Sequence, residues 1–348
     1  MGLLALAPGV RAAQRDFAPV VPGRELRFPQ DEGSHPEFRT EWWYVTGWLE
    51  DASGAALGFQ VTFFRTRPNP DSGNPSRFDP RDILLVHAAV SDPAHGRLRH
   101  MQRAARAGFG LAEALSGRTD VHIDDGYLRA NESGYATRIA GDDFAFDLQL
   151  DPTQPPLLQG DAGFSRKGPR PESASYYYSL PHLRVSGQVT VDGKVRKVGG
   201  LAWFDHEWSS EYLAPEALGW DWTGINLDDG SALMAFRIRA RDHSTYWAAA
   251  TLRDPQLRRV TFAPHEVEWT PLRTWRSPRT GALYPVATRV RAGSLELSLV
   301  PMMDDQENDA RITTGAVYWE GAMTARIGER AVGRGYMELT GYNRRLEM

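Results

Sequence analysis

The sequence predicts an all-β fold, because apolar and polar residues alternate along many short segments. Helical periodicity is nearly absent, and residues 111–115 alone favour a helix, of one or two turns. The 33 glycines and 23 prolines supply turn residues between the segments. Short strands at fairly regular spacing are typical of β-sandwiches and up-and-down barrels.

Hairpins follow one another along the first half of the chain. Residues 42–49 and 57–63 alternate as two strands that the turn sequence at 51–54 joins, and Asp192-Gly193 is a favoured two-residue hairpin turn. The further strands expected in this half are 83–91, 135–139, 144–150, 185–191 and 195–199.

The second half repeats this pattern, with Asp229-Gly230 as a turn. Its expected strands are 223–227, 232–239, 247–253, 287–291, 295–299, 315–325 and 335–342. Two long irregular segments, 67–81 and 152–171, interrupt the strands in the first half. Irregular segments of this length in a compact domain often carry function.

The length of 348 residues exceeds one typical core, so we expect two domains. We place them at 24–204 and 205–348. Residues 1–23 form an arm whose apolar run and Val10-Arg11-Ala12 sequence are typical of the end of a signal peptide, although the basic start is missing. This predicts a periplasmic or secreted bacterial protein; a merely apolar terminus is the alternative. No later run approaches the ~20 apolar residues of a membrane helix, so any membrane association would be peripheral.

Composition and motifs exclude several classes of function. A net charge of −4 gives no indication of a nucleic-acid partner. The absence of Cys excludes thiol catalysis, disulfides and Cys-based zinc sites. The sequence has no nucleophile elbow, Walker loop, dinucleotide fingerprint or His-Glu-x-x-His motif. We therefore expect no cofactor.

Ionisable and indole side chains gather in three tetrads that otherwise read as strands, where β-branched residues would serve better. On a strand, His206 and Trp208 share one face while Asp205 and Glu207 share the other. A metal site at Asp205 and Glu207 would need a third ligand that the sequence does not identify. The tetrads are Glu41-Trp42-Trp43-Tyr44, Asp205-His206-Glu207-Trp208 and Gly219-Trp220-Asp221-Trp222.

These residues predict an apolar pocket whose lining includes an acid or base group. The candidate acid and base groups are His206, Asp205 and Asp221. The candidate lining comprises Glu41, Trp42, Trp43, Tyr44, Tyr176, Tyr178, Trp208, Trp220 and Trp222. Each has a structural alternative: the indoles could plug a core, His206 could be a hydrogen-bonded core residue, and Glu41 could form a buried ion pair with Arg39.

Several long motifs in this order resemble the lipocalin-like family of AttH attachment-related proteins and hydroxyneurosporene synthases, which are carotenoid 1,2-hydratases. The resemblance spans roughly residues 24–345. It is carried by HPEFRTEWWYVTG (35–47), GLAWFDHEW (200–208), GWDW (219–222), DG (229–230), YWEG (318–321) and GYMELTGY (335–342).

The resemblance implies two lipocalin-like, calycin-type antiparallel β-barrel or sandwich domains packed together, with a pocket at or between them, in an exported bacterial protein. Its hydratase branch adds water to a terminal C=C bond of an acyclic carotenoid, and related fungal members resemble polyene cyclases. His206 and Trp208 match a His-x-Trp element of that branch. A later Tyr-x-Asp element has no counterpart in residues 231–237, so Asp221 or Asp205 would have to replace it.

Three hypotheses follow. The first is an exported enzyme for acid-catalysed hydration, isomerisation or cyclisation of an isoprenoid or polyene. The second is a non-catalytic periplasmic carrier of a lipid or another hydrophobic small molecule, and the third is a structural protein of the cell envelope. The sequence does not determine the oligomeric state.

Overall fold

The computed structural model describes residues 17–346, apart from 70–73, 75, 77, 80 and 212. The apolar N-terminal run, on which the signal-peptide hypothesis rests, lies outside the described residues, so export stays a prediction. The described part of the chain contains no helix with the length and apolarity needed to span a lipid bilayer. Its helices are two 3-10 turns, η1 (Gln30–Glu32) and η2 (Pro264–Glu266).

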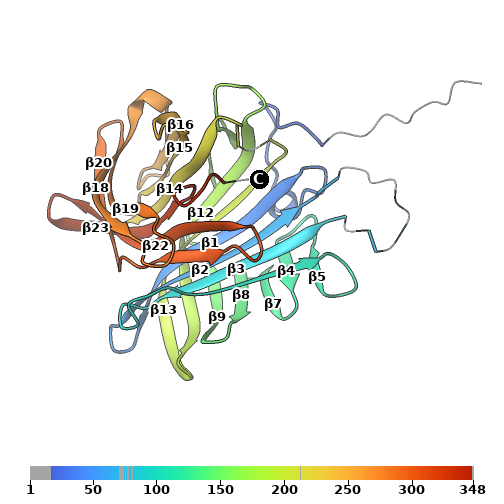
Figure 1. Cartoon of the computed structure of the whole chain (residues 1–348), viewed down its shortest axis with the longest axis horizontal. Coiled ribbons are helices and arrows are strands. Elements are labelled where there is room, and N and C mark those ends of the chain that lie inside the picture. Colours follow the sequence, from blue (N-terminus) through green and yellow to red (C-terminus); the bar gives the residue numbers. More distant parts are fainter. Residues whose placement is uncertain are drawn as a thin grey trace, which may run out of the picture.

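The first sheet is antiparallel, with strand order β4-β3-β2-β1-β13-β12-β9-β8-β7-β6-β5, and β10 and β11 pair with β12 beside this path (Figure 1). Its strands are β1 (Thr40–Asp51), β2 (Ala56–Thr66), β3 (Ile83–Ser91), β4 (Arg99–Arg106), β5 (Ala112–Ala114), β6 (Asp120–Ile123), β7 (Gly126–Ala130), β8 (Tyr135–Ala140), β9 (Phe144–Asp151), β10 (Leu157–Leu158), β11 (Phe164–Arg166), β12 (Ala174–Val191) and β13 (Lys194–Ser209).

The second sheet has the order β17-β16-β15-β14-β23-β22-β20-β19-β18, with β21 pairing with β22. Its strands are β14 (Ala217–Leu227), β15 (Ala232–Ala240), β16 (Thr245–Arg253), β17 (Arg259–Phe262), β18 (Val267–Arg276), β19 (Leu283–Ala292), β20 (Leu295–Pro301), β21 (Glu307–Ala310), β22 (Ala316–Ile327) and β23 (Arg330–Leu339). The predicted all-β fold of two packed domains is confirmed.

Local sequence accounts for these elements. Strand β9 alternates between buried and half-buried residues along its whole length, as a strand covering a core does. At the turn between β12 and β13, Asp192 and Gly193 both have positive φ, 51° and 72°, which is the geometry of the predicted two-residue turn. The prediction of a helical turn at 111–115 is wrong, because Ala112–Ala114 forms β5 and pairs with β6.

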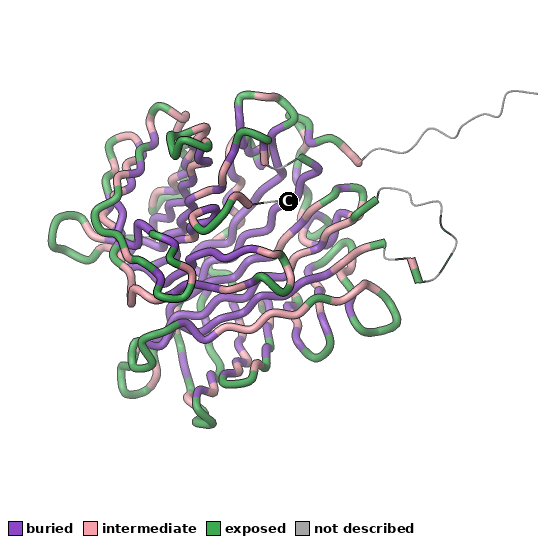
Figure 2. The backbone as a smooth tube through the Cα atoms, viewed as in Figure 1, coloured by how far each residue is buried: buried purple, intermediate pink, exposed green. Residues whose placement is uncertain are grey.

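The two sheets pack face to face through β1, β2, β12 and β13 of the first and β14, β22 and β23 of the second. Strands β1 and β2 and residues 202–209 of β13 are therefore buried on both faces, and Figure 2 shows a buried layer inside the molecule. One face contributes to the core of the first sheet. The other joins an aromatic cluster with the second sheet, including Tyr44, Trp48, Tyr177, Trp203 and Trp222.

The connection between the sheets runs from the end of β13 at Ser209 to the start of β14 at Ala217. The boundary expected near residue 205 thus falls inside β13, near the end of this strand. Residues 205–209 belong to the first sheet, because Thr40 to Tyr44 of β1 pair with them.

Candidate functional site

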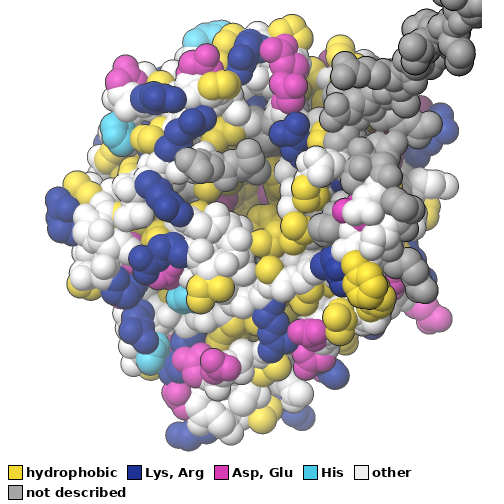
Figure 3. Space-filling view, turned by 45° about the vertical axis from the view of Figure 1, so that its right-hand side comes forward, with side chains coloured by type: hydrophobic (Ala, Val, Ile, Leu, Met, Phe, Trp, Pro, Cys, Tyr) yellow, Lys and Arg dark blue, Asp and Glu magenta, His cyan; other side chains and the backbone are white. Residues whose placement is uncertain are grey.

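A cavity lies between the two sheets, where the aromatic cluster opens. The free space among its lining atoms is about 670 Å³, including a part open to solvent, while the centre of a water-sized molecule can move through only about 70 Å³. Figure 3 shows a hollow with hydrophobic and acidic side chains inside it. The lining consists of Trp42, Tyr44, Thr62, Phe64, Lys167, Tyr177, Asp205, Glu207, Trp220, Trp222, Phe236, Ile238, Tyr318, Glu320 and Glu338.

Strand alternation explains which residues reach this cavity. On β13, Asp205 and Glu207 point toward it, and the residues paired with them on β1 are Tyr44 and Trp42. On the other side of β13, Tyr177 of β12 pairs with Glu207. Directly opposite residues of paired strands share a face, so three adjacent strands of the first sheet present one wall.

The Asp205 carboxylate is buried in this wall and accepts three hydrogen bonds. Trp203 Nε1 and Tyr177 Oη each donate at 2.6 Å, and Ser179 Oγ donates as well. Trp222 Nε1 in turn donates to Tyr177 Oη at 3.0 Å. Burial outweighs the three hydrogen bonds and raises the pKa of Asp205 to about 7. Asp205 can therefore exist as an acid or a base near neutral pH.

Glu207 forms a buried ion pair with Lys167, at 2.7 Å between Oε1 and Nζ. Ser175 Oγ donates a hydrogen bond to the same oxygen. The Lys167 ammonium also lies 4.9 Å from the ring centre of Tyr177 and 4.2 Å from that of Phe236. Burial lowers the pKa of Lys167, although the charge of Glu207 opposes this shift.

The second sheet contributes two further carboxyl groups to the opposite wall. Glu320 of β22 and Glu338 of β23 are directly paired across the two strands. Burial raises the pKa of both groups, and the charge of Glu338 raises that of Glu320 further. Trp220 Nε1 donates a hydrogen bond to Glu338 Oε2 at 2.7 Å.

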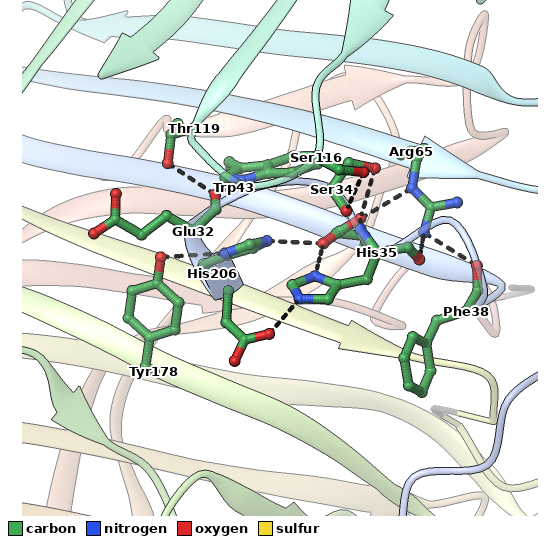
Figure 4. Close-up of polar contacts among 12 residues, drawn as sticks. Glu32, Ser34, His35, Phe38, Trp43, Arg65, Ser116, Thr119, Tyr178 and His206 are labelled. Carbon is green, nitrogen blue, oxygen red and sulfur yellow. Dashed lines mark hydrogen bonds and ion pairs between the residues drawn. The ribbon is translucent and has the colours of Figure 1, made fainter. Parts of the chain in front are cut away.

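The other face of β1 and β13 carries a separate buried network. His206 Nε2 and His35 Nδ1 lie 2.9 Å and 2.7 Å from Glu41 Oε1, and Arg65 Nε donates to Glu41 Oε2 at 2.9 Å. Figure 4 shows His206, His35 and Arg65 converging on one point. Two indoles sandwich the imidazoles: His206 stacks on Trp43 and His35 on Trp208, with ring centres 4.8 Å and 3.8 Å apart.

Electrostatics stabilise charge in this buried network. Burial alone would raise the pKa of Glu41, but the charges of His35 and Arg65 hold it well below its usual value. Burial disfavours a charge on His35, but the charge of Glu41 outweighs burial with the help of Asp31, so the pKa of His35 is raised. For His206 burial prevails, and its pKa is lowered. Glu41 is thus held as a carboxylate by several partners at once. The ion pair expected between Glu41 and Arg39 forms instead with Arg65, which lies directly opposite Glu41 on β2.

The same network is the place where the described residues could hold a metal ion. Ligand atoms of His35, Glu41 and His206 all lie within 4.8 Å of one another. Asp31 Oδ1 lies 3.0 Å from His35 Nε2, and Tyr178 Oη lies 3.2 Å from His206 Nδ1; outer partners of this kind orient metal-bound imidazoles. However, Arg65 already neutralises Glu41, and a cation placed there would face that guanidinium. The arrangement fits an ion-pair network better than a metal centre.

Asp221 lies away from the cavity, because it shares a strand with Trp220 and Trp222 but points to the opposite face. It forms ion pairs with Arg237 at 2.6 Å and Arg239 at 3.0 Å. The structure thus divides the predicted site. Asp205, Trp42, Tyr44, Trp220 and Trp222 line the cavity, whereas His206, Glu41, Trp43, Tyr176, Tyr178 and Trp208 lie in the core of the first sheet and Asp221 lies in the second domain.

The site also contains groups that the sequence analysis did not assign to it, chiefly Lys167, Glu320 and Glu338. A usable signal existed for Glu320 and Glu338, because each is a lone carboxylate within an otherwise apolar strand segment. Lys167 lies in an irregular segment, and nothing in its local sequence distinguishes it from a solvated surface residue.

The fold and the cavity define the class: an all-β protein of two packed lipocalin-like domains with an acidic, aromatic cavity between them. More particularly, the chain belongs to the AttH-like family, whose model matches residues 19–342. It is similar to a crystal structure of a Nitrosomonas europaea protein assigned to AttH, with 56% identity over 94% of this chain and 100% of that one and a TM-score of 0.88.

A more distant likeness concerns the fold alone. Kievitone hydratase from Nectria haematococca shares 15% identity over 94% of this chain and 97% of its own, with a TM-score of 0.67. No protein of curated function matches the sequence.

Proposed function

We propose that the cavity between the sheets is an active site that adds water to a carbon–carbon double bond of a small apolar substrate by acid catalysis. The observation that carries this proposal is the buried Asp205 carboxyl, whose pKa is raised to about 7 in an aromatic cavity. General acids and bases work best when their pKa lies near the working pH. Strongly shifted carboxyl groups in a cleft are typical of catalytic sites.

The reaction would proceed in two balanced steps. The π electrons of the alkene take a proton from a protonated carboxyl group, which forms a C–H bond and leaves a carbocation on the other carbon. A lone pair of water then forms the C–O bond, and the proton that this oxygen loses passes to an ionised carboxylate. The faces of Trp42, Trp222 and Phe236 would stabilise the cation through their π electrons.

The cavity dimensions bear on the substrate. The centre of a water-sized molecule can move through only about 70 Å³ of the cavity, far less than the roughly 300–1,000 Å³ of pockets that enclose a drug-sized ligand. The reacting end of a substrate would fit inside while the remainder extends toward the opening. Kievitone hydratase, as a neighbour in fold, supports only the compatibility of this fold with a hydratase.

The carrier hypothesis accounts less well for the cavity. A carrier for an apolar ligand gains from aromatic walls but loses from buried carboxyl groups, because burying a polar or charged group costs free energy unless it is compensated. Four carboxylates line this cavity, and the pKa values of three are raised by burial.

A panel of prenylated phenols and acyclic isoprenoid alkenes in H₂¹⁸O tests the proposal by mass spectrometry. Wild-type protein should bind a panel member, seen as a change in tryptophan fluorescence, and incorporate ¹⁸O into it. Asp205→Asn should abolish incorporation, while Asp147→Asn, at an exposed ion pair with Arg138, should not. Binding without incorporation would favour the carrier, and absence of both would contradict the proposed cavity function.

A further inference from the structure

We infer that Glu320 and Glu338 together hold one shared proton and act as the proton donor of the cavity. The donor role rests on the proposed function, whereas the sharing of the proton does not.

The geometry places two carboxyl groups side by side without a counter-ion. Glu320 and Glu338 are directly opposite on the antiparallel strands β22 and β23, and both line the cavity. Like charges directly opposite on paired strands are destabilising. Among the residues that the structure describes, no Lys, Arg or His forms an ion pair with either group, in contrast to Asp221 and Glu207, which have their cations close by.

Two carboxylates that share a site cannot both ionise easily, and one retains its proton to unusually high pH. Burial raises the pKa of both groups here, as described above. Burial raises the pKa of Glu338. The hydrogen bond from Trp220 acts against this shift, because it favours the ionised form of Glu338. The contact with Tyr44 lowers the pKa of Glu320, but the charge of Glu338 raises it by more, so the shared proton should reside mainly on Glu320.

Unfilled hydrogen-bonding groups show where the proton would be delivered. Glu320 Oε1 and the Tyr44 hydroxyl are both buried and lack a hydrogen-bond partner among the described residues. The two groups lie in contact, which raises the pKa of Tyr44 and lowers that of Glu320, but the contact falls short of full hydrogen-bond geometry. Buried polar groups without partners are uncommon. Both line the cavity, so a bound substrate or water can satisfy them.

This arrangement separates the two proton-transfer roles. The glutamate pair lies on the second sheet and Asp205 on the first, so an alkene between the walls would meet a donor on one side and an acceptor on the other. The alkene carbon takes the shared proton, water adds to the cation, and Asp205 accepts the proton that water loses. The pair then regains a proton from solvent and Asp205 releases its proton to solvent, which restores both groups.

Infrared titration measures the sharing directly, because a protonated carboxyl group absorbs apart from a carboxylate. Difference spectra between wild type and Glu338→Gln should show that Glu320 loses its proton at a pH lower by about one unit or more in the variant. Glu296→Gln, at an exposed position, should leave the titration unchanged. An unshifted Glu320 titration in Glu338→Gln would overturn the shared proton.

Turnover of a panel substrate tests the donor role. Glu320→Gln and Glu338→Gln should each lower ¹⁸O incorporation by about a hundredfold or more, the usual contribution of a general acid, while substrate still binds. If both variants retained turnover and Asp205→Asn lost it, the pair would not be the donor although the proposed function would stand. If wild type showed no turnover but the titration shift were present, the proposed function and the donor role would fall while the shared proton stood.

Discussion

Asp205 and His206 are neighbours in the chain, but their side chains lie in different compartments on opposite faces of β13. The Asp205 carboxylate lines the cavity between the sheets, and the His206 imidazole is buried in the first sheet against Glu41. One strand thereby serves two purposes: one face presents chemical groups to a cavity while the other anchors the strand through an ion-pair network. The network holds the wall in place without contacting the cavity.

Glu41→Gln should lower the free energy of unfolding by about 3–5 kcal/mol, because it leaves the buried Arg65 charge without its partner. Chemical denaturation measures the change. Glu50→Gln is the matched control: its ion pair with Arg334 is about half exposed, so its loss should cost about 1 kcal/mol or less. Equal effects of the two substitutions would contradict the anchoring role of Glu41.

Lys167→Met should destabilise the protein by about 3–5 kcal/mol, since it leaves Glu207 buried without its cation. The double variant Lys167→Met with Glu207→Gln should recover much of this loss, because neither charge is then buried alone. The double-mutant cycle measures their coupling. Additive losses would show that the pair does not interact as the structure describes.

The stability of the wild type should depend on pH through Asp205. Its pKa is raised from 3.8 to about 7 in the folded protein, so the folded state binds this proton more tightly than the unfolded state does. The resulting stabilisation is fully present below about pH 4 and is lost as the pH rises through about 7, with a total of up to about 4 kcal/mol.

Asp205→Asn removes this contribution, so its free energy of unfolding should fall less than that of wild type between acidic and mildly alkaline pH. Denaturant titrations at several pH values measure the difference. Parallel pH profiles for the two proteins would show that Asp205 titrates normally.

Gly58→Ala tests the close packing of the sheets. A Cβ at Gly58 of β2 would lie 2.5 Å from the Tyr336 hydroxyl and 2.9 Å from the Ala322 Cβ, both in the second sheet. The substitution should cost about 1–3 kcal/mol and loosen the interface. Gly199→Ala is the control, because its Cβ would meet only the Val185 oxygen at 3.6 Å. Thermal unfolding of both variants checks the contrast, and an equal shift in Tm would argue against tight contact between the sheets.

Much of the fold could be predicted from sequence because its strands alternate clearly and its turns use Gly after Asp. Strand β4 could not, since its residues are mostly half-buried and polar and carry no alternation. Strand β5 has only three residues, which are too few to show the alternation of a strand.

The candidate site was only partly predictable, for a physical reason. Alternation correctly separates His206 and Trp208 from Asp205 and Glu207, but it does not say which face of a doubly buried strand meets a cavity. That depends on the partner strand in the other sheet, where Glu320 and Glu338 lie far along the chain from Asp205. Sequence spacing does not indicate that residues this far apart in the chain line the same cavity.

The most direct test compares two adjacent substitutions, Asp205→Asn and His206→Gln, in the ¹⁸O incorporation assay with a substrate that wild type converts. Glutamine at 206 can still donate a hydrogen bond to Glu41, and activity is expressed per folded molecule. The account predicts that Asp205→Asn loses incorporation while His206→Gln retains most of it. Loss in His206→Gln together with retention in Asp205→Asn would contradict the assignment of the chemistry to the cavity face of β13.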